Sequence, residues 1–142
     1  MKRWRTTRGS TTLELAIITP VALALGALIL VGGRIALAQQ TVQAAAHDAA
    51  RSASISRTAG EAHGAARSAA NSSLNNQGLT CAERTVNVDT SGFARPLGVP
   101  ATVTADVSCR VNLGDVALPG LPGTIPVSGH ATSPLDQFRE RR

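Results

Sequence analysis

The residues Gly9-Ser10-Thr11-Thr12-Leu13-Glu14, followed by an uncharged apolar run from Leu15 to Gly33, decide the fold of this chain. The run holds 19 residues, which as a helix extend over roughly 28 Å, close to the ~30 Å hydrocarbon thickness of a bilayer. Glu14 is the first acidic residue, and it stands where a membrane protein ordinarily avoids a carboxylate. The sequence therefore predicts a membrane-spanning helix with an acidic residue at its entrance.

The formal charge of +5 is concentrated at the N-terminus. Residues 10–142 carry ten basic and nine acidic side chains, and the other four basic residues lie within residues 1–9: Lys2, Arg3, Arg5 and Arg8. A basic flank before an apolar run is typical of the cytoplasmic side of a membrane. We expect a single-pass plasma-membrane protein with a cytoplasmic N-terminus and an extracytoplasmic C-terminal body. With two Phe, one Trp, no Tyr and no basic stripe, the sequence excludes nucleic acid as a partner.

Pro20 lies within the apolar run, where its ring removes one backbone hydrogen bond of a helix. We expect a tendency to kink at this position, with the Thr19 hydroxyl as one candidate partner for the freed carbonyl. Gly26, Gly32 and Gly33 leave small faces at which another helix could approach closely. These features permit a helical partner in the membrane without identifying it.

Ala-rich sequence with helical spacing follows the membrane segment. We expect two helices, separated by a bend near residues 57–64 because Gly60 and Gly64 weaken a helix there. Gly78 is suited to the left-handed cap that ends the helical region. Large apolar residues are few, so the core of the body is expected to be small and thin.

After Gly78 the apolar period changes to alternation, which indicates strands. The clearest strand covers residues 101–111, with Cys109 on its apolar face; residues 86–88 and 125–131 suggest two more. The predicted fold class is α+β: a long transmembrane helix continuing into Ala-rich helices, then a small antiparallel sheet of about three strands. The expected segments are a leader (1–9), a transmembrane helix (10–38), Ala-rich helices (39–78), a β region (79–132) and a charged tail (133–142).

Cys81 and Cys109 are the two cysteines, and both follow the membrane segment. In an oxidising compartment their pairing is the default expectation. The disulfide would close a loop of 29 residues, which contributes about 3 to 4 kcal/mol in the chain-entropy model. Two unpaired buried thiols are the alternative, because a sequence does not show the distance between two Cα atoms.

The chain offers few groups for catalysis. His47, His63 and His130 have no close His or Cys neighbour in the sequence that would indicate a metal site. Serines occur without a Gly-x-Ser-x-Gly elbow, and no phosphate-binding glycine loop follows a strand. We expect no enzymatic activity, no cofactor, no metal and no small-molecule substrate.

Glu14 needs a partner or a special depth, because a free carboxylate beside hydrocarbon is costly. If the chain were cut after Gly9, Ser10 would carry a new ammonium four residues before Glu14, and the two charges could pair within one helix or between subunits. Alternatively, Glu14 marks the interfacial end of a signal anchor, stabilised at a helix N-terminus. Spacing alone leaves both interpretations open.

The basic leader, Gly9, Glu14 and the apolar run resemble the class III signal of type IV pilins and pseudopilins. More specifically, Arg8-Gly9-Ser10-Thr11-Thr12-Leu13-Glu14-Leu15-Ala16, Pro20 and the later Ala44-Ala45-Ala46-His47-Asp48-Ala49-Ala50-Arg51-Ser52-Ala53 resemble TadE-like proteins of bacterial tight-adherence (Flp) pilus systems. One departure is Leu15, where pseudopilins of this system often carry Tyr.

This resemblance implies a minor pseudopilin that is involved in pilus assembly and cell adhesion. It implies cleavage after Gly9 by a prepilin peptidase, so that Ser10 becomes the first residue of the mature chain. Glu14 then becomes the fifth residue, with a role in assembly. The implied partners are the membrane, the prepilin peptidase, and other pilins or Tad-system membrane proteins, and the implied location extends to a surface pilus.

Two other functions stay open from the sequence. Ala36-Leu37-Ala38 resembles a signal-peptidase site that would release a secreted binding protein beginning at Gln39. Against this reading, the apolar run is longer than that of usual signal peptides, and Arg34 precedes the site. The other possibility is a signal-anchored structural protein of the envelope with no pilus role.

Overall fold

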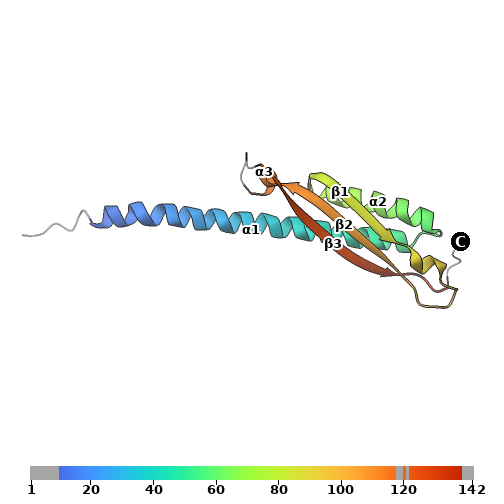
Figure 1. The fold of residues 1–142 in the computed structure, drawn as a ribbon. Helices are drawn as coiled ribbons and strands as arrows, with labels where there is room; N and C mark the ends of the chain where they lie inside the picture. The colour runs from blue at the N-terminus through green and yellow to red at the C-terminus, as the bar shows by residue number, and fades with distance from the viewer. Residues whose placement is uncertain (1–9, 118–119, 121, 139–142) are drawn as a thin grey trace, which may run out of the picture.

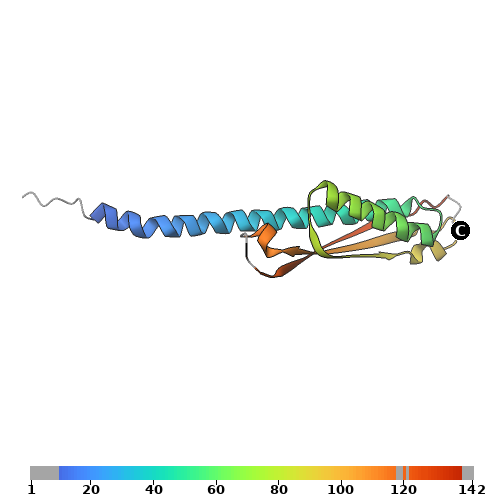
Figure 2. The same cartoon turned by 90° about the horizontal axis from the view of Figure 1, so that it is seen from above.

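The computed structural model describes residues 10–117, 120 and 122–138, with the backbone alone for residues 10–14 and 116. The first half of helix α1 extends as a free rod, and the body is built around its second half (Figures 1 and 2). The predicted α+β class, with a long N-terminal helix and a three-stranded antiparallel sheet, is confirmed. The elements are α1 (Ser10–Ser54), α2 (Ala59–Asn76), β1 (Cys81–Asp89), the 3-10 helix η2 (Ser91–Ala94), β2 (Thr102–Asn112), α3 (Leu113–Val116) and β3 (Thr124–Pro134).

The sheet has the order β1-β2-β3, and both pairings are antiparallel. Val107 of β2 lies opposite Val86 of β1 and opposite Gly129 of β3. Side chains of β2 alternate between buried and exposed positions, as the period-two pattern of residues 101–111 predicts. One face of the sheet therefore packs on the helices, and the other carries polar side chains toward solvent.

The second half of α1 and α2 lie side by side on the apolar face of the sheet (Figure 2). Small side chains allow the backbones of the two helices and the sheet to approach closely, and Leu74 and Val42 are among the largest that are fully buried. The thin core predicted from the composition is what the structure contains. The buried residues of α1 and α2 are Ala38, Val42, Ala45, Ala46, Ala49, Ala50, Ala53, Ala62, Ala66, Ala70, Ser73 and Leu74.

Gly129 marks the closest approach between α1 and β3. A Cβ atom at this position would lie 2.6 Å from the carbonyl oxygen of Val42 and 2.8 Å from the Cα of Gln43. Both neighbours are backbone atoms of a helix, so neither can give way by rotating a side chain. The absence of a side chain at residue 129 is therefore what lets α1 lie directly on the strand.

Two glutamines of α1 bind the outer edge of β3. The amide of Gln43 donates to the carbonyl of His130 (2.7 Å) and accepts from the N–H of His130 (3.2 Å). One helical turn earlier, Gln39 donates to the carbonyl of Ser128 (2.8 Å). Because β3 is an edge strand, these amides satisfy backbone groups that another chain could otherwise pair with.

The break between the two long helices lies at residues 55–58, and glycine does not cause it. Gly60 and Gly64, which were expected to weaken the helix at the break, lie inside α2. The hydroxyl of Thr58 accepts a hydrogen bond from the N–H of Glu61 (3.1 Å), which satisfies one of the free donors at the start of α2. The spacing of Thr58 and Glu61 is that of a capping box, a signal that the sequence analysis missed.

Helix α1 passes through Pro20 without interruption. The Thr19 hydroxyl donates to the carbonyl of Leu15 (2.7 Å), not to the carbonyl of Ala16 that Pro20 leaves without its usual donor.

At the other end of the chain, β3 extends to Pro134. Leu135 is 5% exposed, so the body continues into the first residues of the expected charged tail.

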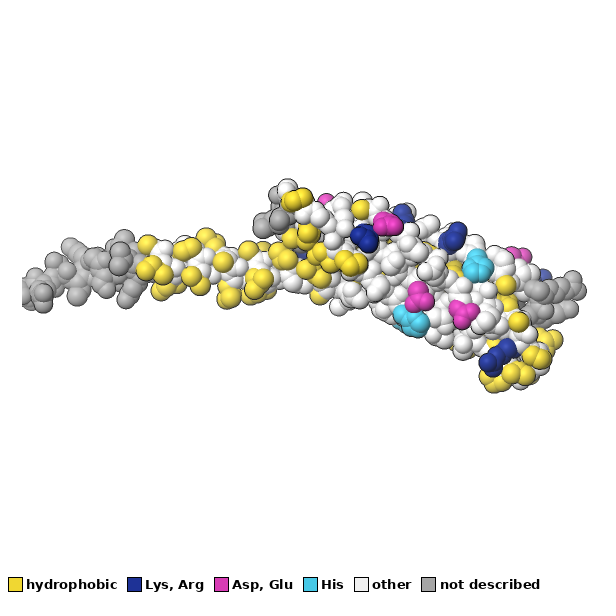
Figure 3. All heavy atoms as spheres, in the orientation of Figure 1, with side chains coloured by type: hydrophobic (Ala, Val, Ile, Leu, Met, Phe, Trp, Pro, Cys, Tyr) yellow, Lys and Arg dark blue, Asp and Glu magenta, His cyan; other side chains and the backbone are white. Residues whose placement is uncertain are grey.

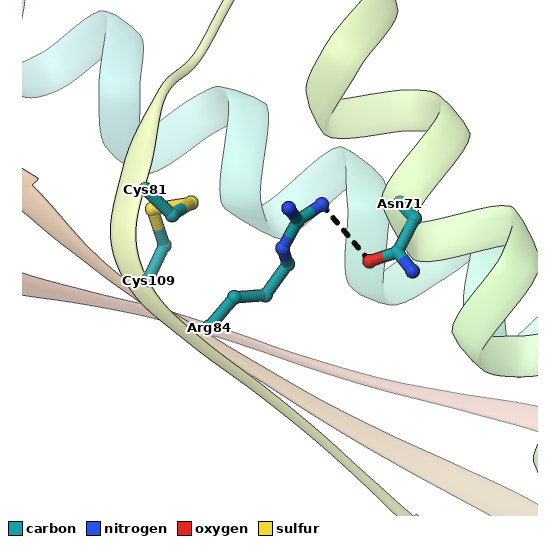
Figure 4. Close-up of a disulfide and its surroundings, with 4 residues drawn as sticks. All are labelled: Asn71, Cys81, Arg84 and Cys109. Carbon is teal, nitrogen blue, oxygen red and sulfur yellow. Dashed lines mark hydrogen bonds between the residues drawn. A yellow bond between two sulfur atoms is a disulfide. The ribbon is translucent and has the colours of Figure 1, made fainter.

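Cys81 and Cys109 form a disulfide between β1 and β2, with their Cα atoms 5.3 Å apart (Figure 4). Cys109 is 1% exposed and faces the helices, as the alternation in β2 predicts. Close by, the Arg84 guanidinium donates to Oδ1 of Asn71 (2.9 Å), which joins β1 to α2 (Figure 4). These two links add to the backbone pairing of β1 with β2, which matters because β1 buries fewer side chains than β2 does.

Replacing Gly129 by Ala is expected to lower the free energy of unfolding by about 1 to 3 kcal/mol, because the new Cβ overlaps the backbone of α1. Urea unfolding of the detergent-solubilised chain, followed by circular dichroism, measures this change. The matched control is Gly64→Ala, whose Cβ meets nothing within 4 Å and which should stabilise α2 by about 0.5 to 1 kcal/mol. Equal effects of the two substitutions would contradict the close approach.

Replacing both cysteines by Ala (C81A/C109A) is expected to destabilise the body by about 3 to 4 kcal/mol, because the disulfide closes a long loop in the unfolded chain. For a body of this size the melting temperature should fall by more than about 10 °C. Thermal unfolding of the wild type with and without reductant supplies the comparison. An unchanged melting temperature in both experiments would show that the core alone stabilises the sheet.

Candidate functional site

The candidate functional site is the apolar stem, which we define as residues Leu15–Gly33 of α1. Within the described part of the chain, α1 is the one helix long and apolar enough to cross a membrane. Nine of its large side chains are 60–70% exposed, and Figure 3 shows hydrophobic side chains all along the rod, whereas they are more scattered on the body. The exposed side chains are Leu15, Ile17, Ile18, Val21, Leu23, Leu25, Leu28, Ile29 and Leu30.

A surface of this kind is not stable in water. Transferring a Leu, Ile or Val side chain out of water contributes about 1.5 to 3 kcal/mol, and the stem exposes nine such residues. A helix that is hydrophobic all round belongs in a membrane or among other helices. The stem is therefore a candidate single-pass membrane anchor.

Small residues interrupt the stem at positions suited to helix packing. A Cβ atom added to Gly26, Gly32 or Gly33 would meet nothing within 4 Å, so all three positions are open to a neighbour. Ala22 and Gly26 stand four residues apart, the small-xxx-small spacing at which membrane helices approach one another closely. The geometry can thus accommodate a second helix against the stem.

The predicted processing and assembly residues lie at the start of α1. Gly9 lies outside the described residues. Ser10 is the first residue of α1, and Glu14 follows four residues later in the same helix. That spacing places the two residues one turn apart, which is the arrangement that a pairing of a Ser10 ammonium with Glu14 requires.

The three histidines lie apart and form no common site. His130 Nδ1 is 2.6 Å from Oδ1 of Asp106 on the exposed sheet face, while His47 lies beside Gln43 and His63 beside Thr90. Among the residues described, no group of three or more His, Cys, Asp or Glu side chains could hold a metal ion.

One carboxylate at the far end of the body has a shifted titration. The N–H of Ser91 donates to Oδ1 of Asp89 (2.9 Å), and this backbone hydrogen bond lowers the pKa of Asp89 below its ordinary value. The bond closes a short turn after β1, at the opposite end of the body from the stem (Figure 1). It is a structural feature of that turn.

Sequence reasoning missed the residues that dock α1 on the sheet. Gly129 interrupts an otherwise alternating strand, which is a recognised sign of close backbone approach. Gln39 and Gln43 stand four residues apart on one face of the helix. No local signal connects these glutamines to β3, since the hydrogen-bonded residues are 87 and 89 positions apart.

Comparison with known proteins finds a similarity in the N-terminal part of the chain. No curated protein and no solved structure matches the sequence. The family model described as TadE-like protein matches residues 9–51. The match includes the whole stem and most of the portion of α1 that packs on the sheet. Residues 9–51 are therefore similar to TadE-like proteins, the family that the sequence resembles.

Proposed function

We propose that this protein is a minor pseudopilin associated with a tight-adherence (Flp) pilus system. The main support is that a single helix of 45 residues consists of an exposed apolar stem and a second half that forms the core of the body. Such a helix can be buried among membrane or filament helices while the body stays outside. The match of the TadE-like family to residues 9–51 supports this assignment. We propose a role in assembly, without catalysis.

The proposed topology follows from the charges that flank the stem. The leader of residues 1–9 carries four basic and no acidic side chains, so it would remain in the cytoplasm. The body, with the disulfide between Cys81 and Cys109, would then lie on the outer side of the plasma membrane, where disulfides persist. Both arguments favour the same orientation.

The proposed maturation is cleavage after Gly9 by a prepilin peptidase. The new ammonium of Ser10 would stand one helical turn from Glu14, at the end of the stem. In a membrane, two opposite charges cost less as a pair than as separate ions. We propose that Glu14 pairs with the Ser10 ammonium of its own or a neighbouring subunit and thereby contributes to assembly.

The geometry speaks against a secreted product that begins at Gln39. Ala38, the last residue of the proposed signal-peptidase site, is 4% exposed within α1. Cleavage after it would separate Gln39, which binds the edge of β3, from the helix that precedes it. The body would lose the packing of Ala38 and the partly buried Ile35. A signal-anchored structural protein without a pilus role is the alternative that the experiments below separate.

In cells that contain a prepilin peptidase, the chain recovered from membranes is expected to have the intact mass of residues 10–142 with one disulfide. The variant Gly9→Val should retain residues 1–9, because a bulkier residue precedes the cleaved bond. Gly26→Ala, within the stem, is the control and should be cleaved like the wild type. A wild-type chain that retains its leader, or one that begins at Gln39, would contradict the assignment.

Glu14→Gln in the same cells separates processing from assembly. This variant keeps the size of the side chain and removes its charge, so it should be cleaved but should no longer co-purify with other pilins or Tad-system membrane proteins. Glu61→Gln, on the exposed surface of α2, is a matched control and should co-purify normally. Normal co-purification of Glu14→Gln would refute the proposed role of the carboxylate in assembly.

A further inference from the structure

A groove of about 480 Å³ opens at the end of the body from which the stem emerges. Its walls come from α1, from the loop between α2 and β1, and from the end of β2 with α3. Figures 1 and 2 both place α3 and the start of β1 at this end of the body. The lining residues that matter here are Arg34, Leu37, Thr41, Gln77, Leu79 and Asp115.

The position of the groove along α1 corresponds to the headgroup layer of a bilayer. Arg34 directly follows the stem, and Thr41 lies seven residues further along the same helix, a rise of about 10 Å. The polar layer on each side of the hydrocarbon is roughly 5 to 7 Å thick. When the stem spans the hydrocarbon, the wall of the groove that α1 contributes therefore lies among lipid headgroups.

The walls of the groove are held in place by backbone hydrogen bonds. Gly78 takes the left-handed conformation (φ +69°) that the sequence predicts for it, and the N–H of Leu79 donates to the carbonyl of Leu74 (3.1 Å). On the opposite wall, the N–H of Leu113 at the start of α3 donates to the carbonyl of Gly123 (3.0 Å). The groove is thus formed before any ligand enters.

The lining carries one positive and one negative side chain, Arg34 and Asp115. Both are exposed, and neither forms an ion pair or side-chain hydrogen bond with any residue that the structure describes. Leu37 and Leu79 add apolar surface to the lining, while Gln77 and Thr41 add polar groups. The groove therefore offers complementary contacts to a ligand that is zwitterionic and partly apolar.

We propose that this groove binds the headgroup of a phospholipid that carries a phosphate and a primary ammonium. The Arg34 guanidinium binds the phosphate with charge-assisted hydrogen bonds. The Asp115 carboxylate accepts hydrogen bonds from the ammonium, which a quaternary ammonium cannot donate. The proposal rests on the membrane anchorage in the proposed function, and it goes beyond that function by assigning a specific lipid to the base of the body.

The test uses the full chain, purified in detergent and examined by native mass spectrometry after addition of phosphatidylethanolamine, phosphatidylcholine or phosphatidylglycerol. We expect one retained phosphatidylethanolamine, with about tenfold less of the other two lipids, since each charge-assisted hydrogen bond is worth roughly that factor. Equal retention of phosphatidylcholine would overturn the proposal, because the bound lipid would then be a general one of the apolar belt.

Arg34→Gln and Asp115→Asn should each reduce the retained phosphatidylethanolamine about tenfold, whereas Arg34→Lys should retain most of it. Arg67→Gln and Asp48→Asn are the matched controls, since both residues are exposed and lie outside the groove. Wild-type retention in Arg34→Gln and Asp115→Asn would sink the proposal. Circular dichroism confirms that each variant is folded, and Arg34→Lys provides a test that does not remove the charge.

The failure of this proposal can be told from the failure of the proposed function. Release of the wild-type chain from membranes by alkaline carbonate would overturn both, since the stem would not be inserted. An uncleaved leader in the presence of a prepilin peptidase would count against pilin processing alone, and lipid retention by the groove would be judged independently of it.

Discussion

The structure depends on the contact between α1 and β3 at Gly129. There the backbone of the helix lies directly on the strand, and the amide of Gln43 holds both backbone groups of His130. This contact places a row of alanines over the apolar face of the sheet and leaves a second face of α1 for α2. A body with so few large apolar residues gains its stability from this close approach and from the disulfide that links β1 to β2.

Because one helix forms both the stem and the centre of the body, the contact at Gly129 also determines how the body is placed relative to the stem. No break separates the stem from the buried half of α1, so the position of the body is set by the same helix that carries the stem. Small residues are favoured in both halves for the same physical reason: Gly26 leaves room for a neighbouring helix, and the alanines from Ala45 onward leave room for the sheet and α2. Arg34 lies where these two environments meet, beside the proposed headgroup groove.

Local patterns in the sequence predicted the fold class and the stem, because each depends on neighbouring residues. The apolar run up to Gly33 and the alternation in residues 101–111 are signals of this kind. The roles of Gly129 and Gln43 depend on contacts between α1 and β3, and Gln43 and His130 are 87 residues apart in the sequence. The spacing of apolar residues within one segment carries no information on such a contact. The start of α2 could also have been predicted from the sequence, because Thr58 and Glu61 have the spacing of a helix N-cap, whereas the glycines do not cause the break. For the site, the position of Glu14 before the apolar run drew attention to it, and the family resemblance implied cleavage after Gly9 and the role of Glu14 in assembly. The groove, in contrast, required the fold to bring Arg34 and Asp115 to one place.

The central claim is that the stem anchors the chain with its body outside the cytoplasm, and the disulfide reports on that directly. Cys81 and Cys109 are the only cysteines of the sequence. A membrane-permeant alkylating reagent, added to intact growing cells before lysis, labels them only if they are free thiols, and this shows on which side of the membrane the body lies. The account predicts a membrane-bound chain whose mass shows no alkyl group, and two alkyl groups only after reduction. Two alkyl groups without reduction would place the body in a reducing compartment and contradict the account.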